Sequence, residues 1–536
     1  MKNRGYYKLI AAVLCAAVIL GAFGCGKQTD AGADSGAPVP SDEITGGITQ
    51  THKTAAEPDK LFTLRFTPGE SLNPMYCDDV YNDAVTSLMY EGLFRLDEGF
   101  QPRNVLCESY ETGDGKTFNF TIADVKLHDG TALTAEDVAY SINFARNSTK
   151  YYARLKNITG CAPLEDGRVQ VTLERCNYAL PALLDIPIIK DGSGSDDVPP
   201  GTGPYKYVKA GDFYVLRAFD GYRSAETLPF EMIYLKEFAD DNIVESFADF
   251  SLDLIWEDTG TDGSVNLHSD HESRLYDTAV LQYIGFNSSS TVMNDANVRR
   301  AISAAVNREY IVNTVFGGNG RPAPLLLNPA YYLYNTAWEA GYGYSPAQLS
   351  ANLAKSGLAD KDSDGFLEYP VSGVYQPFTI RFIVNSENKK KVEAAESIAE
   401  NLRRVGLNVE LKELGWNDFK SALNSGSFDM YYGEASLTRN FDFSVLMGSS
   451  GSLDYGGMGS GSLDALCRAF SGAATDEAKA EAAKALCISS AESAVIVPVM
   501  YRQYVIYTHR GVIEGFSPSV SGVFLDVAEW KANMPE

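Results

Sequence analysis

The chain has 536 residues and a formal net charge of −25, since 70 aspartates and glutamates outnumber 45 lysines and arginines. Nucleic acid and anionic lipid head groups repel such a chain, so we expect neither as a partner. Hydrophobic residues make up 45% of the sequence, and the length suffices for more than one hydrophobic core. Composition therefore predicts an acidic globular protein with several structural units.

Residues 1–24 have the pattern of a secretory signal peptide. Three basic residues precede the apolar run "LIAAVLCAAVILGAF", which is short for a membrane span. The "GC" pair that follows is similar to a bacterial lipobox, in which Cys25 would be lipidated and become the new amino terminus. A soluble secreted protein, cleaved nearby, is the alternative. Residues 25–59 are mainly small and polar and predict a flexible tether.

The first elements after the tether alternate between strand and helix. "KLFTLRF" from Lys60 has the alternation of a strand, and apolar spacing from Val80 to Met89 predicts a helix that Gly92 ends. "LTAEDVAYSINFARN" predicts another helix, with Thr134 as its N-cap. Asp137 stands at the third helical position, which is a capping-box arrangement with Asp in place of Glu.

The stretch "KLHDGTALTAEDV" invites a chemical interpretation, because His128 lies beside Asp129. A catalytic pair would need a nucleophile or a bound metal, and the neighbouring sequence signals neither. Gly130 suits a turn, and the acidic residues that follow suit the first turn of a helix, where the dipole favours negative charge. We therefore predict a structural turn here.

The rest of the chain predicts a sheet layered with helices. "YKYVK" and "YVLRAF" form a strand pair, and "DANVRRAISAAVNREYIVNTVF" predicts a helix pair ending at Gly317. "FTIRFIVN", "KKVEAAESIAENLRRVG" and "LNVELKEL" predict a β-α-β unit. Two helices then precede the apolar strand "VIVPVMYRQYVIYT". The sequence predicts an α/β protein, too large for one small domain.

Six cysteines remain after Cys15 and Cys25 are set aside, which is too few for a disulfide scaffold. Cys161 and Cys176 flank a predicted hairpin with "EDGR" as its turn, and Cys467 and Cys487 lie on successive helices. Either pair could form a disulfide, and buried free thiols are the equal alternative. The spacing of cysteine and histidine gives no zinc pattern.

Taken in order, these pieces resemble the bacterial extracellular solute-binding proteins of family 5, the oligopeptide-, dipeptide- and nickel-binding receptors of ABC importers. The resemblance runs from about Phe62 to Asp526 and includes "LNPMY", "GKTFNFTIADVKLHDGTALTAEDVAYSI", "PGTGPYKYV" and "NDANVRRAISAAVNREYIV". It implies a two-lobed, periplasmic-binding-protein-like type II fold with an extra subdomain. We expect lobe one at 60–280 plus 500–536, with 76–200 as its subdomain, and lobe two at 290–495.

The resemblance also implies where ligand should bind. In peptide-binding relatives the strand matching "DMYYGE" leads to an acidic residue that pairs with the peptide's amino group, and no carboxylate stands at Ser436–Leu437. Arg439 could instead bind a carboxylate or phosphate, or could pair with Asp442. This departure throws doubt on an ordinary peptide ligand. The predicted ligand-binding residues are Asn287, Trp416, Tyr432, Glu434, Arg439 and Asp442.

"DKDSDGFLEYP" suggests a calcium loop, because Asp360, Asp362 and Asp364 alternate before Gly365. An EF-hand would place a glutamate at the twelfth position, where this chain has valine, and Glu368 stands at the ninth. An exposed turn is the alternative. If calcium binds, we expect it as a structural ion. No cofactor is otherwise required.

Together these features predict a lipid-anchored binding protein on the outer face of the bacterial cytoplasmic membrane, monomeric and not an enzyme. Its partners would be a peptide or other small polar solute and the permease subunits of an ABC importer. A ligand sensor signalling to a membrane partner is one alternative. A secreted hydrolase on the same scaffold is another, but the sequence has neither a GxSxG nor an HExxH motif.

Overall fold

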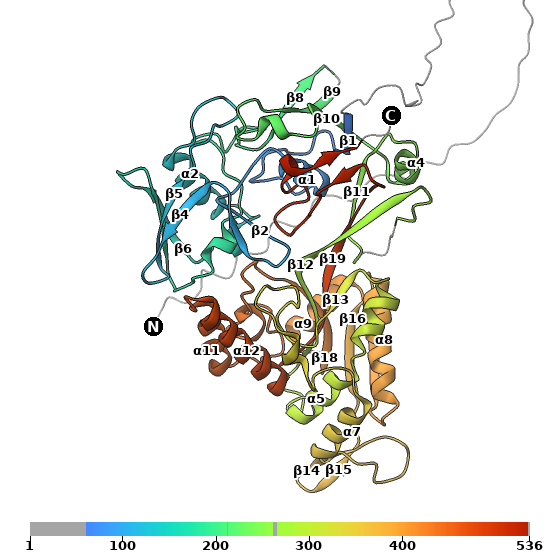
Figure 1. Ribbon diagram of the computed structural model, residues 1–536. Helices are drawn as coiled ribbons and strands as arrows, with labels where there is room; N and C mark the ends of the chain where they lie inside the picture. Colours follow the sequence, from blue (N-terminus) through green and yellow to red (C-terminus); the bar gives the residue numbers. More distant parts are fainter. Residues whose placement is uncertain (1–60, 212, 261–264, 534–536) are drawn as a thin grey trace, which may run out of the picture. The chain divides into compact units, whose positions relative to one another are not determined.

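The computed structural model describes residues 61–533, apart from 212 and 261–264. The predicted signal peptide, the tether and Cys25 lie outside the described residues. Within the described part of the chain, no helix is both long and apolar enough to cross a membrane. The fold is a mixed α/β arrangement of two lobes (Figure 1).

The first lobe contains two four-stranded sheets. In one sheet, with the order β1-β10-β9-β8, β1 is parallel to β10 and the other pairs are antiparallel. The predicted pairing of β8 with β9 is confirmed. The other sheet has the antiparallel order β4-β5-β7-β6, and α2 packs against β6. The strands are β1 (Leu61–Arg65), β4 (Cys107–Glu111), β5 (Thr117–Ile122), β6 (Ile158–Pro163), β7 (Val169–Leu173), β8 (Tyr205–Ala210), β9 (Phe213–Ala218) and β10 (Met232–Lys236).

This lobe also contains four α-helices and two small two-stranded sheets. Strand β2 pairs with β3, and β20 pairs with β21. The elements are α1 (Val80–Thr86), β2 (Phe94–Leu96), β3 (Pro102–Asn104), α2 (Ala135–Ala145), α3 (Tyr152–Leu155), α4 (Ile243–Ala248), β20 (Ile513–Glu514) and β21 (Lys531–Ala532).

The largest sheet has the order β11-β19-β12-β18-β16-β17, with β13 also pairing with β19. The predicted β-α-β unit is confirmed, because β16 and β17 run parallel and α8 connects them. The strands are β11 (Leu254–Glu257), β12 (His271–Phe286), β13 (Gly320–Pro322), β16 (Ile380–Asn385), β17 (Val409–Leu414), β18 (Met430–Ser436) and β19 (Ile496–His509).

Helices cover this sheet in the second lobe. The two helices predicted before the last long strand are α11 and α12, which pack against each other. The helix pair predicted to end near Gly317 is α5, followed by α6 and a π-helical turn at Ile311–Val315. The remaining elements are α5 (Ala296–Ala305), α6 (Arg308–Tyr310), α7 (Pro346–Lys355), β14 (Tyr369–Val371), β15 (Val374–Gln376), α8 (Lys389–Arg403), α9 (Trp416–Ser425), α10 (Ser444–Met447), α11 (Gly461–Ser471) and α12 (Asp476–Ser493).

The long strands β12 and β19 run side by side and antiparallel through both lobes (Figure 1). Their pairing register shifts between Asp277 and Leu281. One hydrophobic core draws on residues from Phe62 to Tyr276 and again from Ile506 to Trp530, whereas a second lies between Ile284 and Met500. Strands β12 and β19 therefore each contribute residues to both cores, one core at each end of the strand. The residue limits given above for the lobes stay predictions.

The helix expected from Val80 to Met89 is shorter than predicted, since α1 ends at Thr86. The carbonyl groups of Leu88 and Met89 accept hydrogen bonds from the amides of Tyr205 and Gly203, at 3.1 and 3.0 Å. The chain after α1 therefore bonds to the start of β8 instead of continuing the helix. Side-chain spacing alone could not reveal this competing partner.

The cysteines of the described residues are free thiols. Cys161 lies in β6 and Cys176 follows β7, but they are not bonded, and neither are Cys467 of α11 and Cys487 of α12. Burial raises the pKa of Cys161, Cys467 and Cys487 to about 12, so these thiols stay protonated at neutral pH.

Candidate functional site

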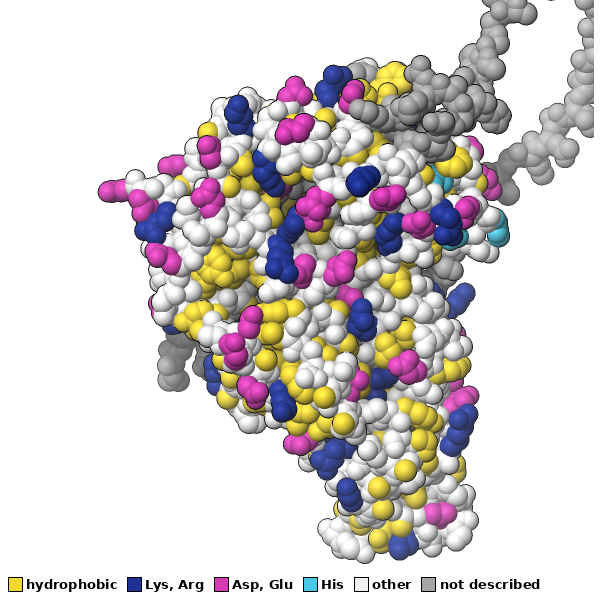
Figure 2. Space-filling model, in the orientation of Figure 1, with side chains coloured by type: hydrophobic (Ala, Val, Ile, Leu, Met, Phe, Trp, Pro, Cys, Tyr) yellow, Lys and Arg dark blue, Asp and Glu magenta, His cyan; other side chains and the backbone are white. Residues whose placement is uncertain are grey.

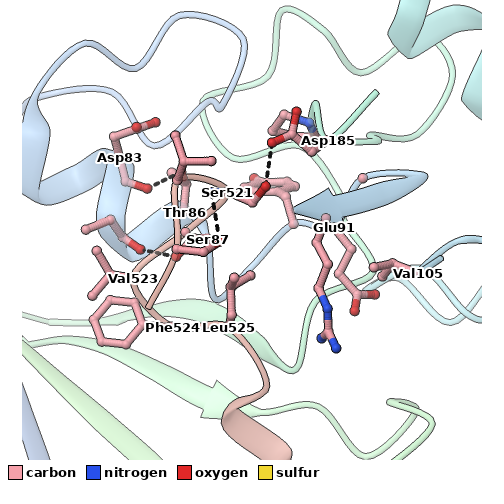
Figure 3. Close-up of a pocket in the computed structure, with 18 of the residues that line it drawn as sticks. Asp83, Thr86, Ser87, Glu91, Val105, Asp185, Ser521, Val523, Phe524 and Leu525 are labelled. Atoms are coloured by element: carbon pink, nitrogen blue, oxygen red, sulfur yellow. Dashed lines mark hydrogen bonds between the residues drawn. The ribbon is translucent and has the colours of Figure 1, made fainter. Parts of the chain in front are cut away.

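A cavity of about 730 Å³ is lined by residues of both lobes. Its volume lies in the range typical of small-molecule sites. Figure 3 shows part of the wall, where Val523, Phe524 and Leu525 of the C-terminal segment lie near the end of α1. The lining comes from residues 80–95, 104–105, 150–154, 185–187, 222–227, 276–280, 436–439 and 519–529, among others.

Three aromatic side chains form one apolar part of the wall. The Trp256 indole nitrogen donates a hydrogen bond of 2.7 Å to the Tyr276 hydroxyl. Tyr504 packs edge-on against both rings, with centroids 4.9 Å from Trp256 and 5.6 Å from Tyr276. Such rings offer a flat apolar surface with a polar tip, which suits the binding of a solute that is partly apolar.

Three cations of the cavity wall are each matched by one carboxylate. Lys150 lies 2.5 Å from Asp83, between Nζ and Oδ1. Arg223 contacts Glu91 through two nitrogens, at 2.9 and 2.5 Å. The third pair joins two more distant segments, Arg95 with Asp526. These paired charges make the wall polar while leaving little net charge.

Asp185 has a different environment, because two arginines share its carboxylate. Arg154 of α3 and Arg439 of the segment after β18 both form ion pairs with it. Ser521 donates a hydrogen bond of 2.6 Å from Oγ to Asp185 Oδ2, which Figure 3 shows as a dashed line. The Asp185 side chain is 2% exposed. Three segments far apart in the sequence therefore meet at this carboxylate.

Of the six predicted ligand-binding residues, Arg439 lines this cavity. Its predicted alternative partner was Asp442, but the ion pair that Arg439 forms is with Asp185. Asp442 instead accepts hydrogen bonds from the amide and hydroxyl of Ser444, at 3.0 and 2.5 Å, at the start of α10. Asp442 therefore serves as a local turn cap in this structure.

Tyr432 and Glu434 lie inside a polar network on the central sheet, away from the cavity lining. The Tyr432 hydroxyl donates a hydrogen bond of 2.7 Å to Oε1 of Gln282. Nε2 of Gln282 in turn donates a hydrogen bond of 3.0 Å to Oε2 of Glu434. Glu434 also contacts Lys391 at 3.1 Å and Arg502 at 3.4 Å. Both predicted residues are thus engaged by neighbouring strands and helix α8.

Asn287 and Trp416 are also outside the lining of the cavity. Asn287 donates from Nδ2 to the carbonyls of Gly426 and Phe428, both at 2.9 Å, and so fixes the chain between α9 and β18. Trp416 begins α9 and its residue surface is 47% exposed, with the Lys420 ammonium 5.1 Å from its ring centroid. The structure therefore does not gather the six predicted residues around one cavity.

Sequence reasoning missed Arg154 and Asp185. A signal for the carboxylate was present, because Asp185 is the one charged residue in "LPALLDIPII". A charge in an apolar run is costly to bury unless it has a partner. No local pattern identifies that partner, however, because Arg154 and Arg439 lie in other segments.

The turn at His128 is structural, as predicted. His128 Nε2 lies 3.0 Å from the carbonyl oxygen of Gly203, and burial lowers the pKa of the imidazole to about 4. Asp129 accepts hydrogen bonds from the Thr131 amide and hydroxyl and forms an ion pair with Lys190. The side chains of His128 and Asp129 thus stabilise the turn through separate partners and do not bond to each other.

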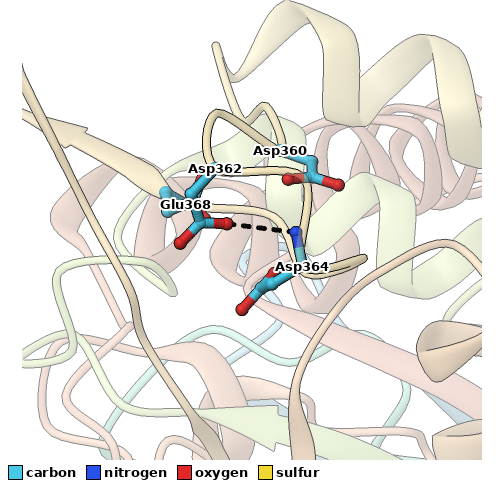
Figure 4. A group of neighbouring side chains, drawn as sticks. All are labelled: Asp360, Asp362, Asp364 and Glu368. Atoms are coloured by element: carbon cyan, nitrogen blue, oxygen red, sulfur yellow. Dashed lines mark hydrogen bonds between the residues drawn. The ribbon is translucent and has the colours of Figure 1, made fainter.

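The predicted calcium loop does bring acidic groups together. Oxygens of Asp360, Asp362, Asp364 and Glu368 all lie within 4.8 Å of one another (Figure 4). Glu368 is 5% exposed, and its Oε2 accepts a 2.7 Å hydrogen bond from the Lys361 amide. Carboxylate oxygens are the ligands that calcium prefers. Binding of the ion stays a prediction.

Comparison with known proteins identifies relatives across most of the chain. Residues 101–454 match the model of the bacterial extracellular solute-binding proteins, family 5 middle region. The oligopeptide-binding protein AppA of Bacillus subtilis is 26% identical over 384 residues, which cover 67% of this chain and 69% of AppA. The glutathione-binding protein GsiB of Salmonella typhi is 26% identical over 313 residues, covering 54% of this chain and 60% of GsiB.

Solved structures agree with this fold. The ABC transporter substrate-binding protein CtaP from Listeria monocytogenes superposes with a TM-score of 0.70 at 19% identity, covering 88% of this chain and 99% of CtaP. The unliganded open form of the periplasmic murein tripeptide-binding protein MppA gives a TM-score of 0.72 at 14% identity, covering 89% of this chain and 98% of MppA. These similarities establish the two-lobed type II fold predicted above.

Proposed function

Because the chain belongs to the bacterial extracellular solute-binding proteins of family 5, we propose that it is the substrate-binding component of an ABC importer. It captures a peptide or other small polar solute between its lobes and delivers it to a membrane permease. The observation that carries this proposal is the cavity of about 730 Å³, whose wall combines aromatic faces with charged side chains of both lobes.

Binding requires no covalent step. A solute that prefers the closed arrangement of the lobes shifts the population toward it, and a permease that recognises this arrangement receives the solute. The names of the relatives, which refer to oligopeptide and glutathione binding, support the same role.

The protein acts as a monomer outside the cytoplasmic membrane, held there by a lipid on Cys25. This part of the proposal rests on the signal-like residues 1–24 and the small, polar composition of residues 25–59. A sensor that signals to a membrane partner would use the same closing lobes. Uptake distinguishes the two roles, because only an importer moves solute across the membrane.

The test begins with the solute itself. Protein purified natively and the same protein after denaturation, dialysis and refolding are compared by mass spectrometry. A solute present only in the native sample, and able to rebind the refolded protein, is then followed in uptake by cells with and without the gene. Loss of uptake in the deletion strain supports the proposal. Unchanged uptake with loss of a transcriptional response would favour the sensor.

A further inference from the structure

The ion pairs around Asp185 leave one positive charge in excess. Two guanidinium groups, from Arg154 and Arg439, face a single carboxylate. The side chains of Arg154, Arg439 and Asp185 are 12%, 25% and 2% exposed, so solvent reaches this group only in part. A charge excess that is largely removed from water favours the binding of an additional anion.

The carboxylates of Asp83, Glu91 and Asp526 form their ion pairs with other cations of the wall. Asp83 attracts Arg439 electrostatically, but its carboxylate lies 2.5 Å from the Lys150 ammonium. Burial lowers the pKa of Arg439 to about 10, so the guanidinium is short of compensation although it still carries its charge at neutral pH. Arg223 pairs with Glu91, whereas Arg95 pairs with Asp526 and is also attracted by Glu529, a further carboxylate of the wall.

The arrangement also leaves donors for a ligand. A guanidinium group has five N–H donors in a planar fork that matches a carboxylate. Arg154 directs Nε to the carbonyl of Leu183, at 3.0 Å, and Nη2 to Asp185. Asp185 has only two oxygens, and Oδ2 already accepts from Ser521. Because Arg154 and Arg439 both line the cavity, their remaining donors can meet a solute there.

We infer that Arg154 and Arg439, with Asp185 as their internal counter-ion, form a subsite for a carboxylate group of the solute. The inference rests on the proposed function and specifies its ligand class. The charge count favours a carboxylate, because one excess positive charge balances one negative charge. A doubly charged phosphate would keep a second negative charge without compensation. Solutes without an anionic group would leave the excess unmatched and would bind more weakly.

Saturation-transfer NMR with sodium acetate as the probe tests this subsite without knowledge of the natural solute. Chloride is exchanged for acetate at constant ionic strength, and N-methylacetamide serves as the neutral probe. We expect saturable transfer to acetate and none to the amide. Arg439→Met should weaken acetate binding at least tenfold. Asp185→Asn should strengthen it several-fold, because both arginines then lack their counter-ion.

The opposite effects of these two substitutions separate a binding role from a structural one. If the three residues merely hold the fold together, both variants should alter acetate binding in the same direction or leave it unchanged. Arg381→Met is the matched control, since Arg381 pairs with Asp429 outside the cavity lining. It should bind acetate like the unaltered protein. Arg439→Lys, which keeps the charge but loses the fork, should bind acetate with intermediate affinity if Arg439→Met does not fold.

Two results would overturn the inference: no saturable acetate binding by the unaltered protein, or equal binding by the unaltered protein and the Arg439 variants. Either result would leave the proposed function intact if the copurified solute still binds and is still taken up. Conversely, acetate binding with the predicted variant pattern, but without solute uptake, would support the subsite and contradict the importer role. The two failures are therefore distinguishable.

Discussion

Asp277 of β12 and Arg321 of β13 form a two-pronged ion pair. Arg321 Nε lies 2.8 Å from Asp277 Oδ1, and Nη2 lies 2.7 Å from Oδ2. Gln503 of β19 also donates to Oδ1, at 3.2 Å. These three side chains together connect β12, β13 and β19. They lie beside the register shift that begins at Asp277, where the chain passes from one hydrophobic core to the other.

Replacing Arg321 with Met should lower the free energy of unfolding by about 2–3 kcal/mol, because Asp277, whose side chain is only 10% exposed, loses two charge-assisted hydrogen bonds. Urea denaturation followed by circular dichroism measures the change. Arg510→Met is the control: it removes an ion pair with Asp270 whose side chains are 60% and 74% exposed, and it should change stability by less than about 0.5 kcal/mol. Equal effects of both substitutions would contradict a stabilising role for the Arg321 pair.

Local signals predicted local structure well. The Thr134 hydroxyl accepts from the Asp137 amide at 3.3 Å, and Asp137 Oδ2 accepts from the Thr134 amide at 2.8 Å, which confirms the predicted capping box of α2. The β-α-β unit around α8 is confirmed for a similar reason. Each depends on the order of side chains within one short stretch, and that order is visible in the sequence.

The candidate site was less predictable because its residues meet only through the fold. Tyr432 and Glu434 were expected at the cleft, but in β18 they face Gln282 of the neighbouring strand. No sequence pattern predicts the ion pair between Asp185 and Arg439, since no spacing rule joins residues in different lobes. Chemical type indicated which residues needed partners, but only the folded chain shows which partners they have.

The buried imidazole of His128 makes stability depend on pH. Its pKa is lowered from 6.5 to about 4 in the folded protein, so between these values the unfolded state binds more protons. Stability should therefore fall as pH decreases from about 6.5 to 4, with no further loss from this group below pH 4. Urea midpoints measured from pH 7 to 4 should fall less steeply for His128→Gln. The same pH dependence in both proteins would contradict this assignment.

Calcium should stabilise the second lobe through the acidic loop. At a free concentration 100 times its Kd, calcium should raise the free energy of unfolding by about 2.7 kcal/mol, and a chelator should reverse the effect. Thermal melting with calcium and with EDTA measures this. The double substitution Asp360→Asn with Asp362→Asn should abolish the response, whereas Asp418→Asn, an exposed change on α9, should retain it. A response that survives the double substitution would place calcium elsewhere.

Membrane attachment should depend on Cys25. Cys25→Ala removes the thiol that the lipid would modify, so the protein should move from the membrane fraction to the soluble fraction or the medium. Cys176→Ala serves as the control, because Cys176 lies in the folded lobe, and this variant should remain with membranes. Immunoblots of the separated fractions give the result. Membrane association of Cys25→Ala would argue against the lipid anchor.

Solute capture between two closing lobes is the central claim, and small-angle X-ray scattering with the copurified solute tests it most directly. The purified protein is measured after removal of the solute and again at saturating concentration, at identical protein concentration. Closure around a solute in the cavity predicts a smaller radius of gyration with the solute than without it. An identical scattering profile in both states, with saturation verified by calorimetry, would contradict capture by lobe closure.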